Sequence, residues 1–67
     1  MLQLTVNGEA RSIAPGSRVA DLVRELGLDG RKIAVERNLE IVPRSRYPLD
    51  ELEQNDRIEI VAFVGGG

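Results

Sequence analysis

Cysteine and histidine are both absent from this chain of 67 residues. The lack of cysteine excludes a disulfide framework, a thiolate metal site and a thiol nucleophile. The lack of histidine removes the commonest general base and metal ligand. No glycine-rich loop between a predicted strand and helix offers a place for a phosphate group. We therefore expect a protein that is not an enzyme and that binds no metal or cofactor of its own.

A strong charge of one sign is also missing, because the formal net charge is -2. This balance provides no basic field for nucleic acid and no polybasic patch for a membrane. No apolar run approaches the roughly 18 residues that span a bilayer, and the N-terminal residues lack the pattern of a signal peptide. With 42% apolar and 30% charged residues, the chain is expected to be one cytoplasmic globular domain without nucleic-acid or membrane partners.

The first part of the chain predicts a β-hairpin. Apolar and polar residues alternate over residues 2–6, which is the period of a half-buried strand. Asn7 and Gly8 follow at once, and this dipeptide favours the positive φ angles of a tight hairpin turn. The return strand is expected over residues 9–14, at an edge of the sheet, because its apolar pattern is weak.

A helix is predicted over residues 18–26. Four apolar residues fall at the i, i+3, i+4 and i+7 positions of one helical stripe, namely Val19, Leu22, Val23 and Leu26. The hydroxyl of Ser17 is expected to cap the first turn. Gly27 stands where the left-handed end of a helix needs a residue without a Cβ atom.

The second half of the chain predicts three strands, over residues 32–36, 40–42 and 57–64. Asn38 marks the turn between the first two, and Pro43 ends the short one because proline lacks a ladder donor. The last of these strands has the best pattern, with one wholly apolar face and Val61 and Phe63 on the other.

The segment over residues 44–54 is polar and irregular, with room for one helical turn near residues 45–47. Leu49 and Leu52 are expected to anchor it to the core. Its acidic residues are interpreted as solvated surface rather than as a calcium loop; they are Asp50, Glu51 and Glu53, followed by Asp56.

This order of elements places one helix on one face of a mixed sheet of four to five strands. The first and last strands are expected to pair in parallel at its centre, since each has an apolar inward face. The predicted class is therefore α+β, with the β-grasp or ubiquitin-like fold over residues 1–64.

Three glycines, Gly65, Gly66 and Gly67, follow directly on the best strand. Nothing in globular packing calls for them, so residues 65–67 are interpreted as a flexible tail. Three extended residues span about 10 Å, and without Cβ atoms they can enter a narrow cleft. Such a tail would deliver the carboxylate of Gly67, ionised at neutral pH, to the catalytic centre of another protein for adenylation with ATP and attack by a sulfur nucleophile.

The chain resembles the ThiS family, the sulfur carrier proteins of thiamine biosynthesis. The resemblance is carried by residues 4–9 (LTVNGE), 19–22 (VADL), 41–44 (IVPR) and 56–61 (DRIEIV), together with the glycine tail. It implies that a ThiF-type adenylyltransferase, using ATP and Mg²⁺, adenylates Gly67. Sulfur from a cysteine desulfurase would then give a thiocarboxylate, which would donate sulfur to thiazole synthase.

Partner docking is expected near the tail, at Val61, Phe63 and Val64, because exposed apolar residues often mark a contact surface. Arg44 and Arg46 are interpreted as a solvated loop in preference to a second contact. Three other functions stay open: the carrier subunit of molybdopterin synthase, a ubiquitin-like modifier that conjugates Gly67 to lysines, and a plain interaction module with an inert tail.

Overall fold

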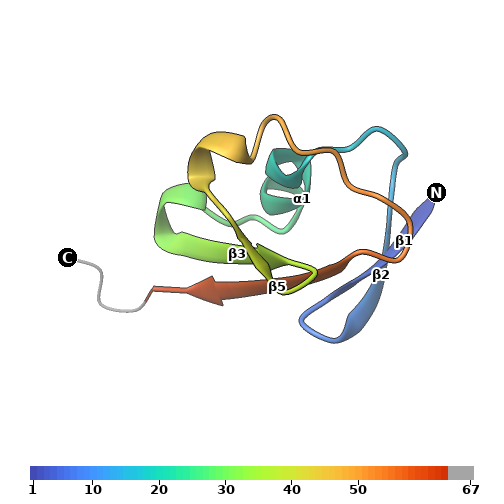
Figure 1. Ribbon diagram of the computed structural model, residues 1–67, viewed down its shortest axis with the longest axis horizontal. Helices are drawn as coiled ribbons and strands as arrows, with labels where there is room; N and C mark the ends of the chain where they lie inside the picture. The colour runs from blue at the N-terminus through green and yellow to red at the C-terminus, as the bar shows by residue number, and fades with distance from the viewer. Residues whose placement is uncertain (64–67) are drawn as a thin grey trace.

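Five strands and one α-helix make up the computed structural model, which describes residues 1–63 (Figure 1). Two short 3-10 turns lie between the larger elements. In chain order the elements are β1 (Leu2–Val6), β2 (Glu9–Ile13), α1 (Val19–Glu25), η1 (Gly30–Lys32), β3 (Ile33–Arg37), β4 (Glu40–Val42), η2 (Arg44–Arg46) and β5 (Arg57–Ala62).

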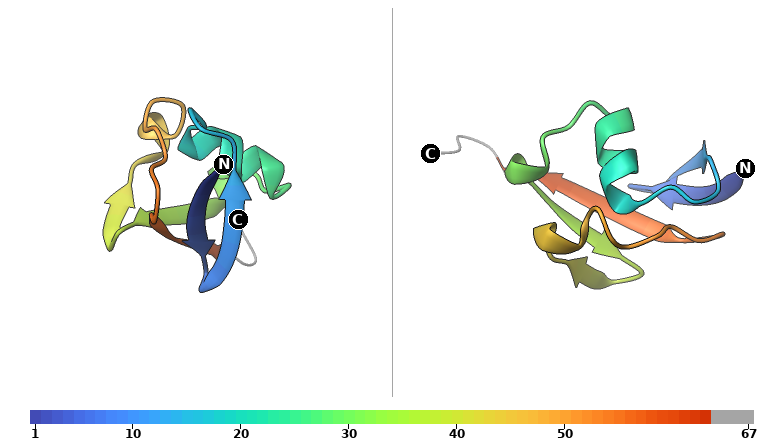
Figure 2. Two further views of the ribbon diagram at one scale, coloured as in Figure 1. Left: turned by 90° about the vertical axis from the view of Figure 1, so that its right-hand side faces the viewer. Right: turned by 90° about the horizontal axis from the view of Figure 1, so that it is seen from above.

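The strands form one mixed sheet in the order β2-β1-β5-β3-β4. β1 and β5 pair in parallel at the centre, and the other neighbouring pairs are antiparallel. The helix α1 covers one face of this sheet (Figure 2). The prediction of a β-grasp fold with a central parallel pair and β2 at an edge is thus confirmed.

Both hairpins turn through two residues with positive φ angles. Asn7 and Gly8 have φ values of 51° and 81°, as expected for a type I′ turn. Asn38 and Leu39 adopt 52° and 70° in the second hairpin, where a leucine is an uncommon choice. The side chain of Leu39 is 72% exposed, so burial of an apolar side chain does not explain why a leucine occupies this turn.

The start of α1 corrects the prediction that Ser17 caps it. The helix begins one residue later than expected, after an N-cap at Arg18. Backbone carbonyls of the irregular segment accept the first helical N–H groups: Val19 donates to Asp50 (3.0 Å) and Ala20 to Tyr47 (2.8 Å). With those donors satisfied by the fold, the Ser17 hydroxyl is not needed as a cap.

The C-terminal end of α1 has the structure that Gly27 predicts. Gly27 has a φ of 73°, and its N–H donates to the carbonyl of Arg24 (3.0 Å). The N–H of Leu28 reaches back to Val23 (3.1 Å). This is the pair of bonds of a Schellman motif, which satisfies carbonyls that the last helical turn would otherwise leave unpaired.

The core lies between α1 and the inner face of the sheet. Val19, Leu22 and Ile58 are each 0% exposed, which confirms the apolar stripe of the helix and, at Ile58, the inward face of β5. Farther along that face Ile60 is half-buried and Ala62 is exposed. Leu52 is buried as expected, but the prediction for Leu49 is wrong, because it is 54% exposed. Tyr47 takes the anchoring position instead, at the end of η2, and is 6% exposed.

Asp56 is buried, at 4% exposed, which corrects the prediction of a solvated surface position. Its carboxylate accepts hydrogen bonds from Arg37 Nε (2.8 Å), Asn38 Nδ2 (3.0 Å) and the Glu53 N–H (2.8 Å). The network joins the β3–β4 turn to the segment that leads into β5. Buried charge is tolerated here because it is both paired and hydrogen-bonded.

We predict that Asp56→Ala destabilises the fold by about 3 kcal/mol, because it leaves Arg37 and two further donors without their acceptor. Urea denaturation followed by circular dichroism measures this difference. Asp50→Ala is the matched control, since it removes only a pair with Arg46, whose side chain is 54% exposed, and should cost less than about 1 kcal/mol. Equal, small effects of both substitutions would contradict the structural role of the Asp56 network.

Candidate functional site

The central strand β5 carries the chain from the core to one end of the molecule (Figure 1). Its pairing with β3 runs from Ile58 to Ala62, and the N–H of Phe63 donates to the Lys32 carbonyl (2.8 Å) one step farther. The strand ends at Ala62 rather than at Val64 as predicted. Val64, Gly65, Gly66 and Gly67 lie outside the described residues, so the predictions made for them stay predictions.

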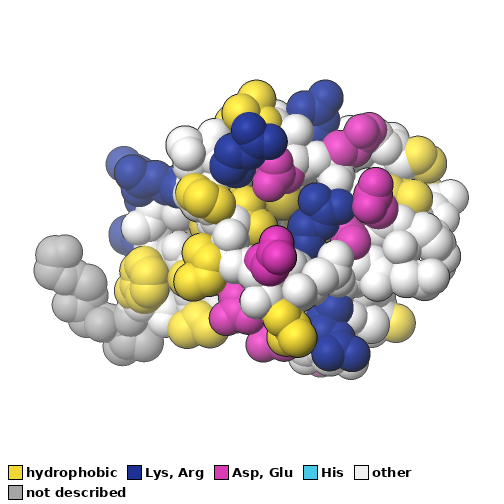
Figure 3. All heavy atoms as spheres, viewed as in Figure 1, with side chains coloured by type: hydrophobic (Ala, Val, Ile, Leu, Met, Phe, Trp, Pro, Cys, Tyr) yellow, Lys and Arg dark blue, Asp and Glu magenta, His cyan; other side chains and the backbone are white. Residues whose placement is uncertain are grey.

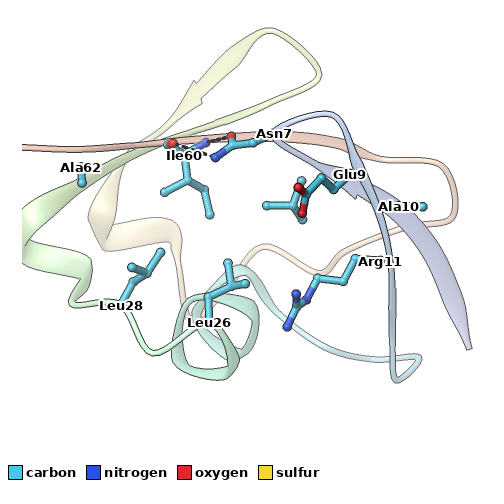
Figure 4. A pocket seen from close by; sticks show the side chains of 9 residues that line it. Asn7, Glu9, Ala10, Arg11, Leu26, Leu28, Ile60 and Ala62 are labelled. Carbon is cyan, nitrogen blue, oxygen red and sulfur yellow. Dashed lines mark hydrogen bonds between the residues drawn. The ribbon is translucent and has the colours of Figure 1, made fainter.

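The side chain of Asn7 fastens β5 where β1 has ended (Figure 4). The parallel ladder reaches Val6 opposite Ile58, and the Asn7 N–H donates to the Ile58 carbonyl (2.9 Å). The Asn7 amide then accepts from the Ile60 N–H (2.7 Å) and donates to the Ile60 carbonyl (3.2 Å). The Asn7 side chain therefore makes the two hydrogen bonds that the next peptide unit of β1 would make if that strand continued. These bonds fix the direction in which β5 leaves the sheet.

Val61 and Phe63 lie on the face of the sheet opposite α1, as the sequence predicts, and are 63% and 59% exposed. The register places Ala34 of β3 directly opposite Val61. Ile41 of β4 is 72% exposed. We refer to Ala34, Ile41, Val61 and Phe63 as the docking patch.

A shallow hollow of about 340 Å³ is lined in part by Ala34, Ile41 and Phe63. In Figure 3, apolar side chains gather at the end of the sheet from which the chain leaves, with both basic and acidic side chains beside them. Sequence reasoning found Val61 and Phe63 but missed Ala34 and Ile41, because the register between β3, β4 and β5 decides which face they share.

Charged groups also line the hollow beside Phe63, among them Arg31 and Arg44. The Arg31 guanidinium holds Asp29 (3.0 Å), and its hydrogen bonds lower the pKa of the Asp29 carboxyl to about 2. Asp29 is therefore ionised at neutral pH. Arg46 is paired with Asp50 (2.7 Å), and Arg44 is exposed. Because Arg44 lines the same hollow as Phe63, the interpretation of that loop as solvated stays a prediction.

A second hollow, of about 430 Å³, lies between the β1–β2 hairpin, the end of α1 and β5 (Figure 4). Leu26, Leu28 and Ile60 supply apolar walls, and Glu9 and Arg11 stand at its polar side. Over residues 1–63 the structure brings together no group of three or more metal-ligating side chains. Nor is any helix in that part of the chain long and apolar enough to cross a membrane.

Comparison with known proteins gives one consistent family. The sequence profile of the ThiS family matches residues 4–67. A thiazole synthase of Paramagnetospirillum magneticum is 52% identical over 66 residues, which cover 98% of this chain and 20% of that protein. The sulfur carrier protein ThiS of Bacillus subtilis is 47% identical over 49 residues, covering 73% of this chain and 74% of the relative. This chain thus spans about a fifth of the length of the matching thiazole synthase.

The fold agrees with the sequence matches. The crystal structure of a thiamine biosynthesis protein (ThiS) from Geobacter metallireducens superposes with a TM-score of 0.84 at 29% identity. The superposition covers 98% of this chain and 100% of that one. It supports the assignment of the β-grasp fold.

We predict that Asn7→Gly loosens the end of β5 while preserving the turn, because glycine tolerates the positive φ at this position. Exchange of the Ile60 amide hydrogen should become about tenfold faster, the effect of losing one net hydrogen bond. Asn7→Asp keeps the acceptor oxygen and should restore most of the protection. The Val35 amide serves as internal reference, and unchanged exchange at Ile60 in Asn7→Gly would refute the fastening role.

Proposed function

The chain belongs to the ThiS family, and from that membership we propose that it is a sulfur carrier of thiamine biosynthesis that acts through its C-terminal residue, Gly67. The family match over residues 4–67 supports this proposal, as does the named sulfur carrier among its relatives. The single structural observation that carries it is the course of β5, which occupies the centre of the sheet and ends at Ala62, two residues before the glycine segment in the sequence.

In this proposal the carrier contributes a single reactive group, the carboxylate of Gly67. At neutral pH the Gly67 carboxylate is ionised, because the pKa of a terminal α-carboxyl group is ordinarily about 3.3–3.7, and it is a poor electrophile. A ThiF-type adenylyltransferase would join it to ATP with release of pyrophosphate, giving a mixed anhydride. The terminal sulfur of a persulfide formed by a cysteine desulfurase would then displace AMP and give an acyl disulfide. A second thiol would attack the cysteine sulfur of that S–S bond, forming a disulfide and releasing the thiocarboxylate of Gly67. The Mg²⁺ ion and the basic residues for these steps belong to the activating enzyme.

The glycines suit this role for steric reasons. Gly65, Gly66 and Gly67 carry no Cβ atoms, so a partner can close its backbone around them. Extended, they would reach about 10 Å beyond the domain. We propose that residues 1–64 form the part that a partner grips and that residues 65–67 form the part that it threads.

Thiazole synthase is the proposed acceptor of the sulfur. The support is that a protein named thiazole synthase contains a region 52% identical to nearly the whole of this chain. A carrier and its acceptor that act in sequence gain from being held close together, because a linked partner binds at a high effective concentration. Molybdopterin synthase remains the comparison partner for a binding experiment, since it would bind the chain if the pathway assignment were wrong.

We predict that incubation with ATP, the adenylyltransferase and a sulfur source converts the chain to a thiocarboxylate. Intact mass spectrometry should show replacement of one oxygen by sulfur, located at Gly67 by fragmentation. A chain lacking Gly67 should show no conversion, while its circular dichroism spectrum and thermal unfolding match those of the full chain. Absence of conversion in the full chain with competent enzymes would remove the carrier function.

The docking patch gives a second prediction. Phe63→Ala should raise the KM of the adenylyltransferase for the chain about tenfold, because an aromatic anchor of an interface is lost. Its stability should change by less than about 1 kcal/mol, since Phe63 is largely exposed already.

Leu49→Ala is the matched control, because Leu49 is similarly exposed at 54% and lies away from the patch. It should leave the KM unchanged. A folded Phe63→Ala variant with the KM of the unaltered chain would contradict docking through this residue.

A further inference from the structure

Two glutamates face each other across the middle of the sheet. The register of β3 and β5 places Glu36 directly opposite Glu59, two residues along from Ala34 and Val61. Because side chains alternate along a strand, both carboxylates lie on the same outer face as the docking patch. Ile41 of the patch is the partner of Glu36 on the other side, in β4.

This arrangement costs stability in the free protein. Cβ atoms directly opposite in an antiparallel pair are about 4.5–5.5 Å apart, and like charges there repel. Five ion pairs are found among residues 1–63, and neither Glu36 nor Glu59 takes part in any of them. The arginine nearest along the same face, Arg57, likewise makes none within that part of the chain.

Arg37, the cation next to Glu36 in β3, pairs with other carboxylates. Arg37 follows Glu36 and therefore points to the opposite face, where it holds Asp56 (2.8 Å) and Glu53 (3.5 Å). Five of the nine other carboxylates among residues 1–63 form ion pairs, namely Asp21, Asp29, Asp50, Glu53 and Asp56. The Glu36–Glu59 pair is thus a local excess of negative charge at the edge of an exposed apolar surface.

We propose that the Glu36–Glu59 pair and the docking patch form one contact surface for the activating enzyme, which presents an arginine or lysine to the two carboxylates. This inference rests on the proposed function, in which that enzyme takes up the tail. The distance is suitable: Phe63 and Glu59 are four residues apart on an extended strand, or about 13 Å. One partner of ordinary interface size covers both.

The Glu36–Glu59 pair would mainly affect which partners can bind this surface. A partner that covered these carboxylates without supplying a cation would bury two repelling charges, which is costly. A partner with an arginine could bridge both carboxylates with its forked guanidinium. The same repulsion that weakens the free sheet thus favours one kind of partner over others.

The test uses the double variant Glu36→Gln, Glu59→Gln in the full chain. Its thermal midpoint should be at least as high as that of the unaltered chain, and up to about 2–5 °C higher, because the repulsion between the two carboxylates is removed. Its affinity for the adenylyltransferase should nevertheless fall at least about tenfold, as expected when a partner's buried cation loses its counter-charge. The dependence of affinity on salt concentration should also become weaker.

Glu25→Gln, Glu51→Gln is the matched control, because both residues are exposed and lie off this face. It removes the same net charge and should bind almost as tightly as the unaltered chain. If the unaltered chain is activated and the Glu36, Glu59 variant binds equally well, the inference is overturned and the carrier function stands. If the unaltered chain is neither bound nor activated, both fail.

Discussion

The parallel pairing of β1 with β5 is the constraint on which the rest of the molecule depends. It places the last strand at the centre of the sheet, where one face of β5 is buried under α1 and the other stays open. Because side chains alternate along a strand, the same six residues supply the core through Ile58 and the docking patch through Val61. The strand that holds the small domain together is therefore also the strand that precedes the segment proposed to carry the reactive carboxylate.

Most of the fold could be predicted from local patterns. The Asn7-Gly8 turn, the stripe of α1 and the alternation in β5 each have a short-range signal that a single sequence displays. The exposure of Val61 and Phe63 follows from the same alternation. Gly67 is identified from composition and resemblance, and it lies outside the described residues, so the fold supports its role only through the path of β5 toward it.

What could not be predicted depends on contacts between distant segments. In the sequence Asn7 is a turn residue, yet its amide also holds Ile60, 53 positions away. Asp56 resembles the surface carboxylates that precede it, and its burial is explained by the approach of Arg37 and Asn38 from a distant part of the chain. Ser17 is the better local cap, but carbonyls of the irregular segment satisfy the first helical donors instead. In each case tertiary hydrogen bonding outweighs the local preference.

In the proposed function the molecule is a carrier whose only chemistry is the carboxylate of Gly67, and its outer sheet face is proposed to select the enzyme that receives it. The central claim of the proposed function is that sulfur is carried as a thiocarboxylate on Gly67. The most direct measurement is the intact mass, with C-terminal fragmentation, of the protein isolated from the cells that make it. The expected result is a set of molecules that end at Gly67, a fraction of them with sulfur in place of one carboxylate oxygen. A polypeptide that continues uncut beyond Gly67 in every molecule would contradict the claim.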